Sequence, residues 1–364
     1  MQYWLKRAGR KRLDRVDWAD APTGCRRPRH RVSAAREDLV LQVRKELKEQ
    51  SDLGEYGARA IHRELSDRHQ QDPTVEVPSV RTIGRILRRR GALDGRRRVR
   101  RPAPPRGWFL PEVAAGRAEV DSFDIVEDLV IQGGIFVHVL NGISLHGGLS
   151  ASWPRSQITA KNTVESLLEH WRTFGLPSYA KFDNDTVFQG PHQFADTFGR
   201  VTRLCLSLGV TPLFAPPAEM GFQADIESYN GRWQEKVWRR FRFTEVADVV
   251  AQSDRFVAAC RRRSAARIEA APGRRPFPQN WKLDLQAPLR GTVIFLRRTD
   301  EDGHASFLGH RYLVSSTWCH RLVRAEVDLT HGKIRIYTLR RREPSSQPLL
   351  ITHRYRPPEK RFHE

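Results

Sequence analysis

The chain has 364 residues, more than one compact core usually organises, so two or three domains are expected. Its 63 lysine and arginine residues against 42 aspartate and glutamate residues give a formal net charge of +21, which favours nucleic acid as the partner. The sequence has no long apolar run and no amino-terminal signal core, so it favours neither a membrane span nor export and predicts a cytoplasmic protein.

The basic residues are clustered at 6–12, 26–31, 88–101 and 261–275, whereas acidic residues are scattered through the middle of the chain. Clustering is expected where particular segments meet phosphates, although a high-GC genome, which raises the arginine content, would give the same total charge. The cysteines are far apart and form no C-x-x-C pair, which indicates reduced thiols rather than a disulfide framework or a zinc site.

Residues 1–36 form a basic arm with too few periodic apolar positions to build a core. Residues 37–93 predict a small helical domain. Leu39 to Leu47 show helical spacing, a second helix runs from about Ala58 to Ser66, and Ser79 can cap a third helix with Val80, Ile83 and Leu87 inward.

The third helix is the candidate recognition helix of a helix-turn-helix DNA-binding domain, because its other positions are basic, as a helix in a major groove requires. A solvated arginine-rich face is the alternative. A basic, proline-rich linker follows at 94–111. The residues of these segments expected to bind DNA are Arg81, Thr82, Arg85, Arg88, Arg89, Arg90, Arg97, Arg98, Arg100 and Arg101.

Residues 112–243 show the pattern of an α/β core, with three strands followed by alternating helix and strand. The predicted strands lie at 118–126, 134–140, 146–151, 179–182 and 211–214, and a helix spans about Ala160 to Phe174.

A helical and proline-rich connector is expected at 244–284, with the helix at about Thr244 to Arg267. Short alternating stretches at 285–354 then predict a small antiparallel barrel or sheet, with a tail at 355–364.

Three carboxylates stand out by their context. Asp121 lies on an apolar strand, Asp183 directly follows a short strand, and Glu227 is near the start of a helix. Taken singly each signal is weak, because aspartate often forms turns and glutamate favours a helix start. Phosphodiester chemistry gives a reason for all three, because two Mg²⁺ ions need oxygen ligands to clamp the attacking and leaving oxygens.

Other acidic residues compete for the same roles. Asp124 lies on the opposite strand face from Asp121, so only one of the two can point at the site, and Asp124 is retained as the fallback. The remaining competitors are Glu127, Asp128, Asp185 and Asp225.

The stretches "EVDSFDIV", "KFDNDTVF" and "ADIESYNGRWQEKV" resemble, in this order, the catalytic core of integrase-like transposases, a family with an RNase H-like mixed sheet and an Asp, Asp, Glu triad. The resemblance covers roughly residues 115–245. The segment "EYGARAIHRELSDRHQQDPTVEVPSVRTIGRILRRRGAL" also resembles the helix-turn-helix ahead of the core in many insertion-sequence transposases. The resemblance to the catalytic core implies that Asp121, Asp183 and Glu227 are catalytic and hold two Mg²⁺ ions, with Mn²⁺ as a substitute.

The chain departs from the family pattern at four positions. Asp185 stands where the family has glycine, Ala224 and Asp225 stand where it often has glycine and a basic residue, and Gln234 stands where many relatives have lysine or arginine. These changes bear on substrate contacts more than on the metal site.

The resemblance implies a bacterial, nucleoid-associated DNA transposase that cleaves 3′ ends and transfers strands, working as a homo-oligomer on double-stranded element ends and target, with accessory regulatory proteins as further partners. Arg232 is expected to contact DNA, whereas Trp233 and Trp238 fit a core more readily than base stacking. An inactive or regulatory DNA-binding relative and an RNase H-fold nuclease without strand transfer are the alternatives.

Overall fold

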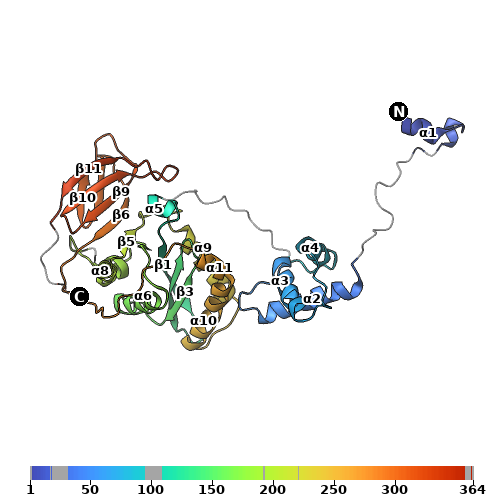
Figure 1. The fold of residues 1–364 in the computed structure, drawn as a ribbon, viewed down its shortest axis with the longest axis horizontal. Coiled ribbons are helices and arrows are strands. Elements are labelled where there is room, and N and C mark those ends of the chain that lie inside the picture. The colour runs from blue at the N-terminus through green and yellow to red at the C-terminus, as the bar shows by residue number, and fades with distance from the viewer. Residues whose placement is uncertain are drawn as a thin grey trace. The chain divides into compact units, whose positions relative to one another are not determined.

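The computed structural model describes residues 2–16, 18, 32–94, 109–191, 193–219, 221–356 and 362. The chain divides into two compact units, one of residues 1–49 and 56–95 and the other of residues 50–55 and 96–364 (Figure 1). The linker arginines Arg97, Arg98, Arg100 and Arg101 lie outside the described residues. No helix in the described part of the chain is long and apolar enough to cross a membrane.

The first unit is helical. Two short elements, α1 (Gln2–Ala8) and a 3-10 helix (Leu13–Arg15), lie in the predicted arm, and α2 (Ala34–Gln50), α3 (Ala58–Gln71) and α4 (Val80–Arg89) follow. Ser79 caps α4 as predicted, because its side chain accepts a hydrogen bond from the Thr82 amide at 3.3 Å. The apolar faces of α2, α3 and α4 share one small core, formed by Val40, Val43, Ile61, Leu65, Ile83, Ile86 and Leu87.

The second unit is mixed α/β, as the sequence predicted, and is built on a nine-stranded sheet of order β11-β10-β9-β6-β5-β4-β1-β2-β3. Strands β1 (Val120–Val130), β2 (Phe136–Ser144) and β3 (Ser150–Arg155) pair antiparallel, and β4 (Tyr179–Phe182) and β5 (Thr211–Phe214) add in parallel beyond β1. The helices of this part are α5 (Pro111–Ala114), α6 (Ala160–Phe174), α7 (Thr186–Gln189), α8 (Arg200–Ser207), α9 (Ala224–Trp233), a π-helix (Gln234–Trp238), α10 (Val246–Arg263) and α11 (Ala265–Glu269).

The carboxy-terminal strands continue the same sheet. Strand β6 (Thr292–Arg298) pairs in parallel with β5, and β9 (Leu322–Asp328), β10 (Lys333–Thr338) and β11 (Leu349–Arg354) follow antiparallel. Strands β7 (His304–Phe307) and β8 (His310–Leu313) form a separate two-stranded sheet. The sequence predicted this region as a small barrel or sheet of its own, and the structure instead joins it to the core through β5 and β6.

A row of neighbouring aromatic rings runs across the junction of the core and the carboxy-terminal strands. Phe123, Phe182, Phe214 and Phe295 lie on β1, β4, β5 and β6, with successive centroids 5.7, 6.1 and 5.2 Å apart. Helices α6 and α8 pack on this face, and α9 and α10 pack on the other face of β1 to β3 (Figure 1). Because both faces are buried, the register of β1 decides which of its polar side chains faces which helices.

Candidate active site

Two carboxylates meet where the carboxyl end of β4 lies beside its neighbouring strand β1. These strands are parallel, with Ser122 opposite Lys181, and continuing that register by two residues places Asp124 opposite Asp183. Asp183 follows the last residue of β4, at the carboxyl end where open α/β sheets usually carry their sites. The structure thus brings Asp183 together with Asp124, the fallback residue of the sequence prediction.

Helix α9 presents Glu227 to the same pair. The Asn230 side chain, one turn after Glu227, donates to Asp124 Oδ2 at 2.7 Å, so the helix face that carries both residues is turned toward β1. At the helix start, Asp225 accepts from Lys181 Nζ and from Ser122 Oγ, each at 2.5 Å. Two contacts therefore tie α9 to the adjacent strands on which the site is built.

The electrostatics of Asp124 reflect this crowding. Burial raises the pKa of Asp124 to about 7, the charges of Asp183 and Glu227 add to the rise, and the hydrogen bond from Asn230 opposes it. Burial also raises the pKa of Asp183, as do the charges of Asp185 and Glu127, while the Asp185 amide donates to Asp183 Oδ1 at 3.0 Å. A divalent cation would relieve the repulsion among such acids.

Asp121 occupies a different environment, and this corrects the prediction that it joins Asp183 and Glu227. Its carboxylate is buried on the opposite face of β1 and accepts a bidentate pair from Arg274 at 2.5 and 2.8 Å, and Trp171 Nε1 donates to it at 3.0 Å. Burial alone would raise its pKa, but the charge and hydrogen bonds of Arg274 hold that pKa below the usual value. Asp121 is therefore neutralised within the protein.

A polar network beneath the site fixes Asn230. The Asn230 Oδ1 accepts from Asn141 Nδ2 at 2.9 Å, and Asn141 Oδ1 accepts from the Ser152 hydroxyl at 2.6 Å. Ser152 lies 2.8 Å from the Tyr229 hydroxyl on α9. Nothing in the sequence singled out Asn141 or Ser152, although the polar positions within apolar strands were visible there. The network orients the donor that holds Asp124.

Two of the other acidic competitors, Asp185 and Asp225, are already engaged, whereas Glu127 and Asp128 are exposed on β1. Asp185 caps α7, because its side chain accepts from the Val187 amide at 2.7 Å, and Asp225 pairs with the buried Lys181. On the same helix as Glu227, Trp233 is fully buried and donates to Ser253, so it belongs to the core, and Trp238 is partly buried against that core.

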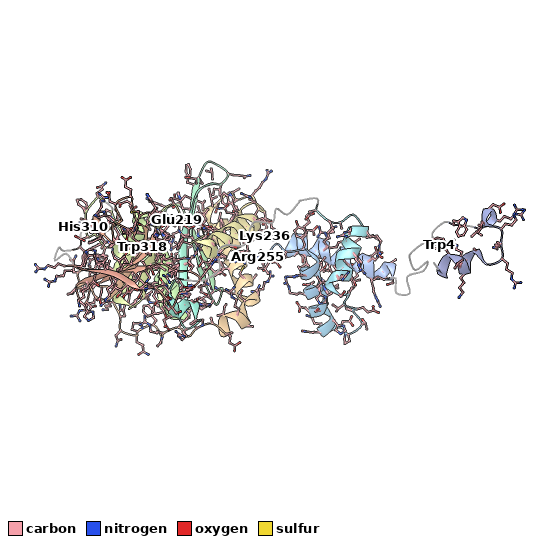
Figure 2. The ribbon with its side chains drawn as sticks, turned by 90° about the horizontal axis from the view of Figure 1, so that it is seen from above. Trp4, Glu219, Lys236, Arg255, His310 and Trp318 are labelled. Atoms are coloured by element: carbon pink, nitrogen blue, oxygen red, sulfur yellow. The ribbon has the colours of Figure 1, made fainter. Side chains whose placement is uncertain are left out.

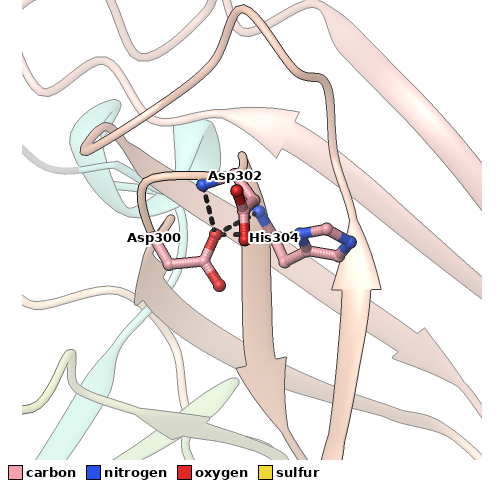
Figure 3. Close-up of side chains that lie close together, drawn as sticks. All are labelled: Asp300, Asp302 and His304. Carbon is pink, nitrogen blue, oxygen red and sulfur yellow. Dashed lines mark hydrogen bonds and ion pairs between the residues drawn. The ribbon is translucent and has the colours of Figure 1, made fainter.

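A second cluster lies in the turn between β6 and β7. Among the described residues, Asp300, Asp302 and His304 form a group of potential ligands whose atoms all lie within 4.8 Å of one another (Figure 3). Asp300 accepts from the His304 amide at 2.9 Å and pairs with Arg311, and the amide hydrogen bond first, then the Arg311 pair, lower the pKa of Asp300 to about 2. These contacts describe a turn closed by its own hydrogen bonds.

The predicted DNA-binding residues of α4 fall into two groups. Arg81, Arg85 and Arg88 are exposed at spacings of four and three residues, which places them along one face of the helix. Arg89 pairs with Glu37, and Arg90 with Asp38, both on α2. The first group is available to phosphates, and the second stabilises the helical unit.

Thr82 and Arg232 also make local contacts. Thr82 Oγ1 lies 3.0 Å from the capping hydroxyl of Ser79, and the guanidinium of the exposed Arg232 lies 5.6 Å from the centroid of the Tyr229 ring. The basic cluster at 261–275 is used within the fold. Its arginines contact backbone carbonyls or carboxylates, and these residues are Arg261, Arg262, Arg263, Arg267, Arg274 and Arg275.

No family model matches the chain, and no curated protein matches it. Among solved structures, an intasome of simian T-cell lymphotropic virus in complex with PP2A regulatory subunit B56 gamma is 14% identical and is matched over 81% of this chain and 98% of that chain, with a TM-score of 0.35. The HTLV-2 integrase catalytic core domain in complex with magnesium is 12% identical over 37% of this chain and 80% of that chain, with a TM-score of 0.29.

The catalytic core domain of BIV integrase is 15% identical over 39% of this chain and 80% of that chain, with a TM-score of 0.27. At these identities and TM-scores, the similarities do not define a family for this chain.

Proposed function

We propose that the protein is a DNA transposase or integrase whose catalytic carboxylates are Asp124, Asp183 and Glu227. The observation that carries the proposal is the convergence of these acids at one sheet edge, where the pKa of Asp124 is raised to about 7. None of the three forms an ion pair with a described side chain. Asp124 and Asp183 are partly buried without a countercharge, which fold energetics alone do not account for, and such groups are typical of functional sites.

The donor set fits Mg²⁺, with Mn²⁺ as a substitute, because both ions prefer carboxylate oxygens. When bound, two such ions supply a clamp for the attacking and leaving oxygens of an in-line displacement. Within the chain, Asp124 and Asp183 would hold ions from the sheet and Glu227 from α9. Asn230 keeps the Asp124 carboxylate oriented, and the Lys181–Asp225 pair keeps the start of α9 on β4.

The reaction would be 3′-end cleavage followed by strand transfer, with the freed hydroxyl attacking target DNA. The helical unit at 37–93 would bind element ends through Arg81, Arg85 and Arg88, whose exposure leaves them open to phosphates. The rest of the proposed organisation is the linker at 94–111, the core at 112–243, the connector at 244–284, the strands at 285–354 and the tail at 355–364. The assembly would be a homo-oligomer on double-stranded DNA in the bacterial nucleoid, with accessory regulatory proteins.

The test is cleavage of end-containing duplex DNA with Mg²⁺ by the Asp183→Asn and Glu227→Gln variants. Each should lose strand cleavage while its affinity for the duplex stays close to that of the unmodified protein, because the substitutions leave the helical unit intact. Asp302→Asn, an exposed change in the β6–β7 turn, is the matched control and should cleave normally.

Undiminished cleavage in both variants would exclude the site. Cleavage without joined products would favour a nuclease on the same fold, and binding without any cleavage in the unmodified protein would favour a regulatory DNA-binding protein.

A further inference from the structure

A buried arginine of the carboxy-terminal strands reaches the turn that carries Asp183. Arg297 lies on β6, and only 7% of it is exposed. Its Nη2 donates to Asn184 Oδ1 at 2.7 Å, and Asn184 directly follows Asp183. Because β6 pairs in parallel with β5, the sheet itself delivers this side chain to the candidate active site.

The remaining bonds of Arg297 go to neutral oxygens. Nη1 donates to Leu296 O at 2.8 Å and to Ala215 O at 3.3 Å, and Nε donates to Ser306 O at 3.0 Å. Asn184 Nδ2 also donates to Ala215 O, at 2.7 Å. The guanidinium, the Asn184 amide and the carbonyl after β5 thus form a closed set of hydrogen bonds. A planar group with several donors in fixed directions is needed to reach all of these acceptors.

This set fixes the Asp183 turn from the side away from α9. Asn184 is held by Arg297 and Ala215, and the next amide, that of Asp185, donates to Asp183 Oδ1 at 3.0 Å. Burying a guanidinium without a carboxylate partner is costly, and burial lowers the pKa of Arg297 to about 10. The hydrogen bonds that the guanidinium donates offset this cost, and an apolar side chain would leave Asn184 Oδ1 and Ser306 O without this donor.

Two further arginines of the carboxy-terminal region, Arg298 on β6 and Arg341 between β10 and β11, hold the loop that leads to Glu227. Arg341 Nη2 donates to Gly221 O at 2.7 Å, and its guanidinium lies 4.2 Å from the centroid of Phe222. Arg298 pairs with Glu219, which is labelled in Figure 2. Both segments that lead to candidate metal ligands are therefore held by side chains from beyond residue 290.

We propose that Arg297, acting through Asn184, is a positioning residue for the candidate metal site, so that the carboxy-terminal strands are part of the catalytic unit. This inference rests on the proposed function, because it assumes that Asp183 binds a metal ion. Residues that orient ligands in this way typically change metal affinity by about 10–100-fold when they are removed.

The experiment measures Mn²⁺ binding by calorimetry, without DNA, on the full-length protein and three variants. Asn184→Ala and Arg297→Met should weaken Mn²⁺ binding about tenfold and raise the Mg²⁺ concentration for half-maximal nicking by a similar factor. Arg324→Met is the matched control. Arg324 is equally buried, on the neighbouring strand β9, but it donates to Phe109 O and pairs with Glu326 instead of touching the Asp183 turn.

The control should lose thermal stability as Arg297→Met does and yet bind Mn²⁺ as the unmodified protein does. Asn184→Ala keeps the test decisive if Arg297→Met fails to fold, because Asn184 is only partly buried. Unchanged Mn²⁺ affinity in Asn184→Ala would overturn the positioning role. An unmodified protein that binds no Mn²⁺ would instead overturn the proposed function.

Discussion

Replacing Asp124 by asparagine removes a negative charge that destabilises the metal-free fold. The pKa of Asp124 is raised from 3.8 to about 7, so the folded protein keeps a proton that the unfolded chain releases between about pH 4 and 7. Stability therefore falls as pH rises through this window, and the full cost is present above pH 7. At about 1.4 kcal/mol per pK unit, the shift corresponds to at most about 4 kcal/mol.

Asp124→Asn should abolish this pH dependence. The asparagine Oδ1 can still accept the hydrogen bond that Asn230 donates to Asp124. In EDTA at pH 8 the variant should be more stable than the unmodified protein by about 2–4 kcal/mol, and near pH 4 the two should be equal. Urea unfolding followed by circular dichroism at both pH values measures the difference. Added Mg²⁺ should stabilise the unmodified protein only, and the variant should not nick DNA.

Asp121→Asn is the matched comparison on the other face of β1. It leaves the buried guanidinium of Arg274 without its carboxylate, which should cost about 3–5 kcal/mol at pH 8. The two asparagine variants thus have opposite expected effects on stability. Normal nicking by Asp124→Asn, together with a folded but inactive Asp121→Asn, would refute the assignment of the first carboxylate.

Two further predictions concern the ion pairs around the site and on the helical unit. Lys181→Met should destabilise the protein by about 3–5 kcal/mol, and the double variant with Asp225→Leu should cost less, which a thermal double-mutant cycle would measure. A double variant as unstable as the sum of its single changes would contradict this reasoning. Arg85→Ala should lower the salt dependence of duplex binding by about one unit of slope, measured by fluorescence anisotropy. Arg89→Ala should instead lower thermal stability, since Arg89 pairs with Glu37, and equal slopes for both variants would argue against the proposed contact face.

Elements with strong local patterns could be predicted from the sequence. Helix α6 was expected at about Ala160 to Phe174 and has those bounds in the structure, and strands β4 and β5 likewise match their predicted ranges. Asp183 and Glu227 were selected as candidates because each lies at a recognisable place, the end of a strand and the start of a helix. Local periodicity was sufficient where the contacts that matter are near in sequence.

The choice between Asp121 and Asp124 depended on contacts that are distant in sequence. The two-residue periodicity of a strand showed that the two residues face opposite sides of β1. It could not show on which side a basic side chain neutralises the carboxylate. Arg274, which neutralises Asp121, lies in a proline-rich connector more than a hundred residues away, within a cluster interpreted as phosphate-binding. The parallel pairing of β5 with β6 was missed for the same reason, because strands so far apart leave no local signal of their register.

The two faces of β1 show how the fold separates structural from functional charge. On the face toward α6, Asp121 is buried with its countercharge, which makes the pair part of the scaffold. On the face toward α9, Asp124 is crowded by Asp183 and Glu227, and it accepts a hydrogen bond from the side-chain amide of Asn230. Asp121 and Asp124 are three positions apart on one strand, yet among the described side chains only Asp121 has a countercharge. The buried Lys181 nearby is paired with Asp225, and among the described residues no arginine or lysine forms an ion pair with Asp124, Asp183 or Glu227, which makes these carboxylates the candidate site for added metal ions.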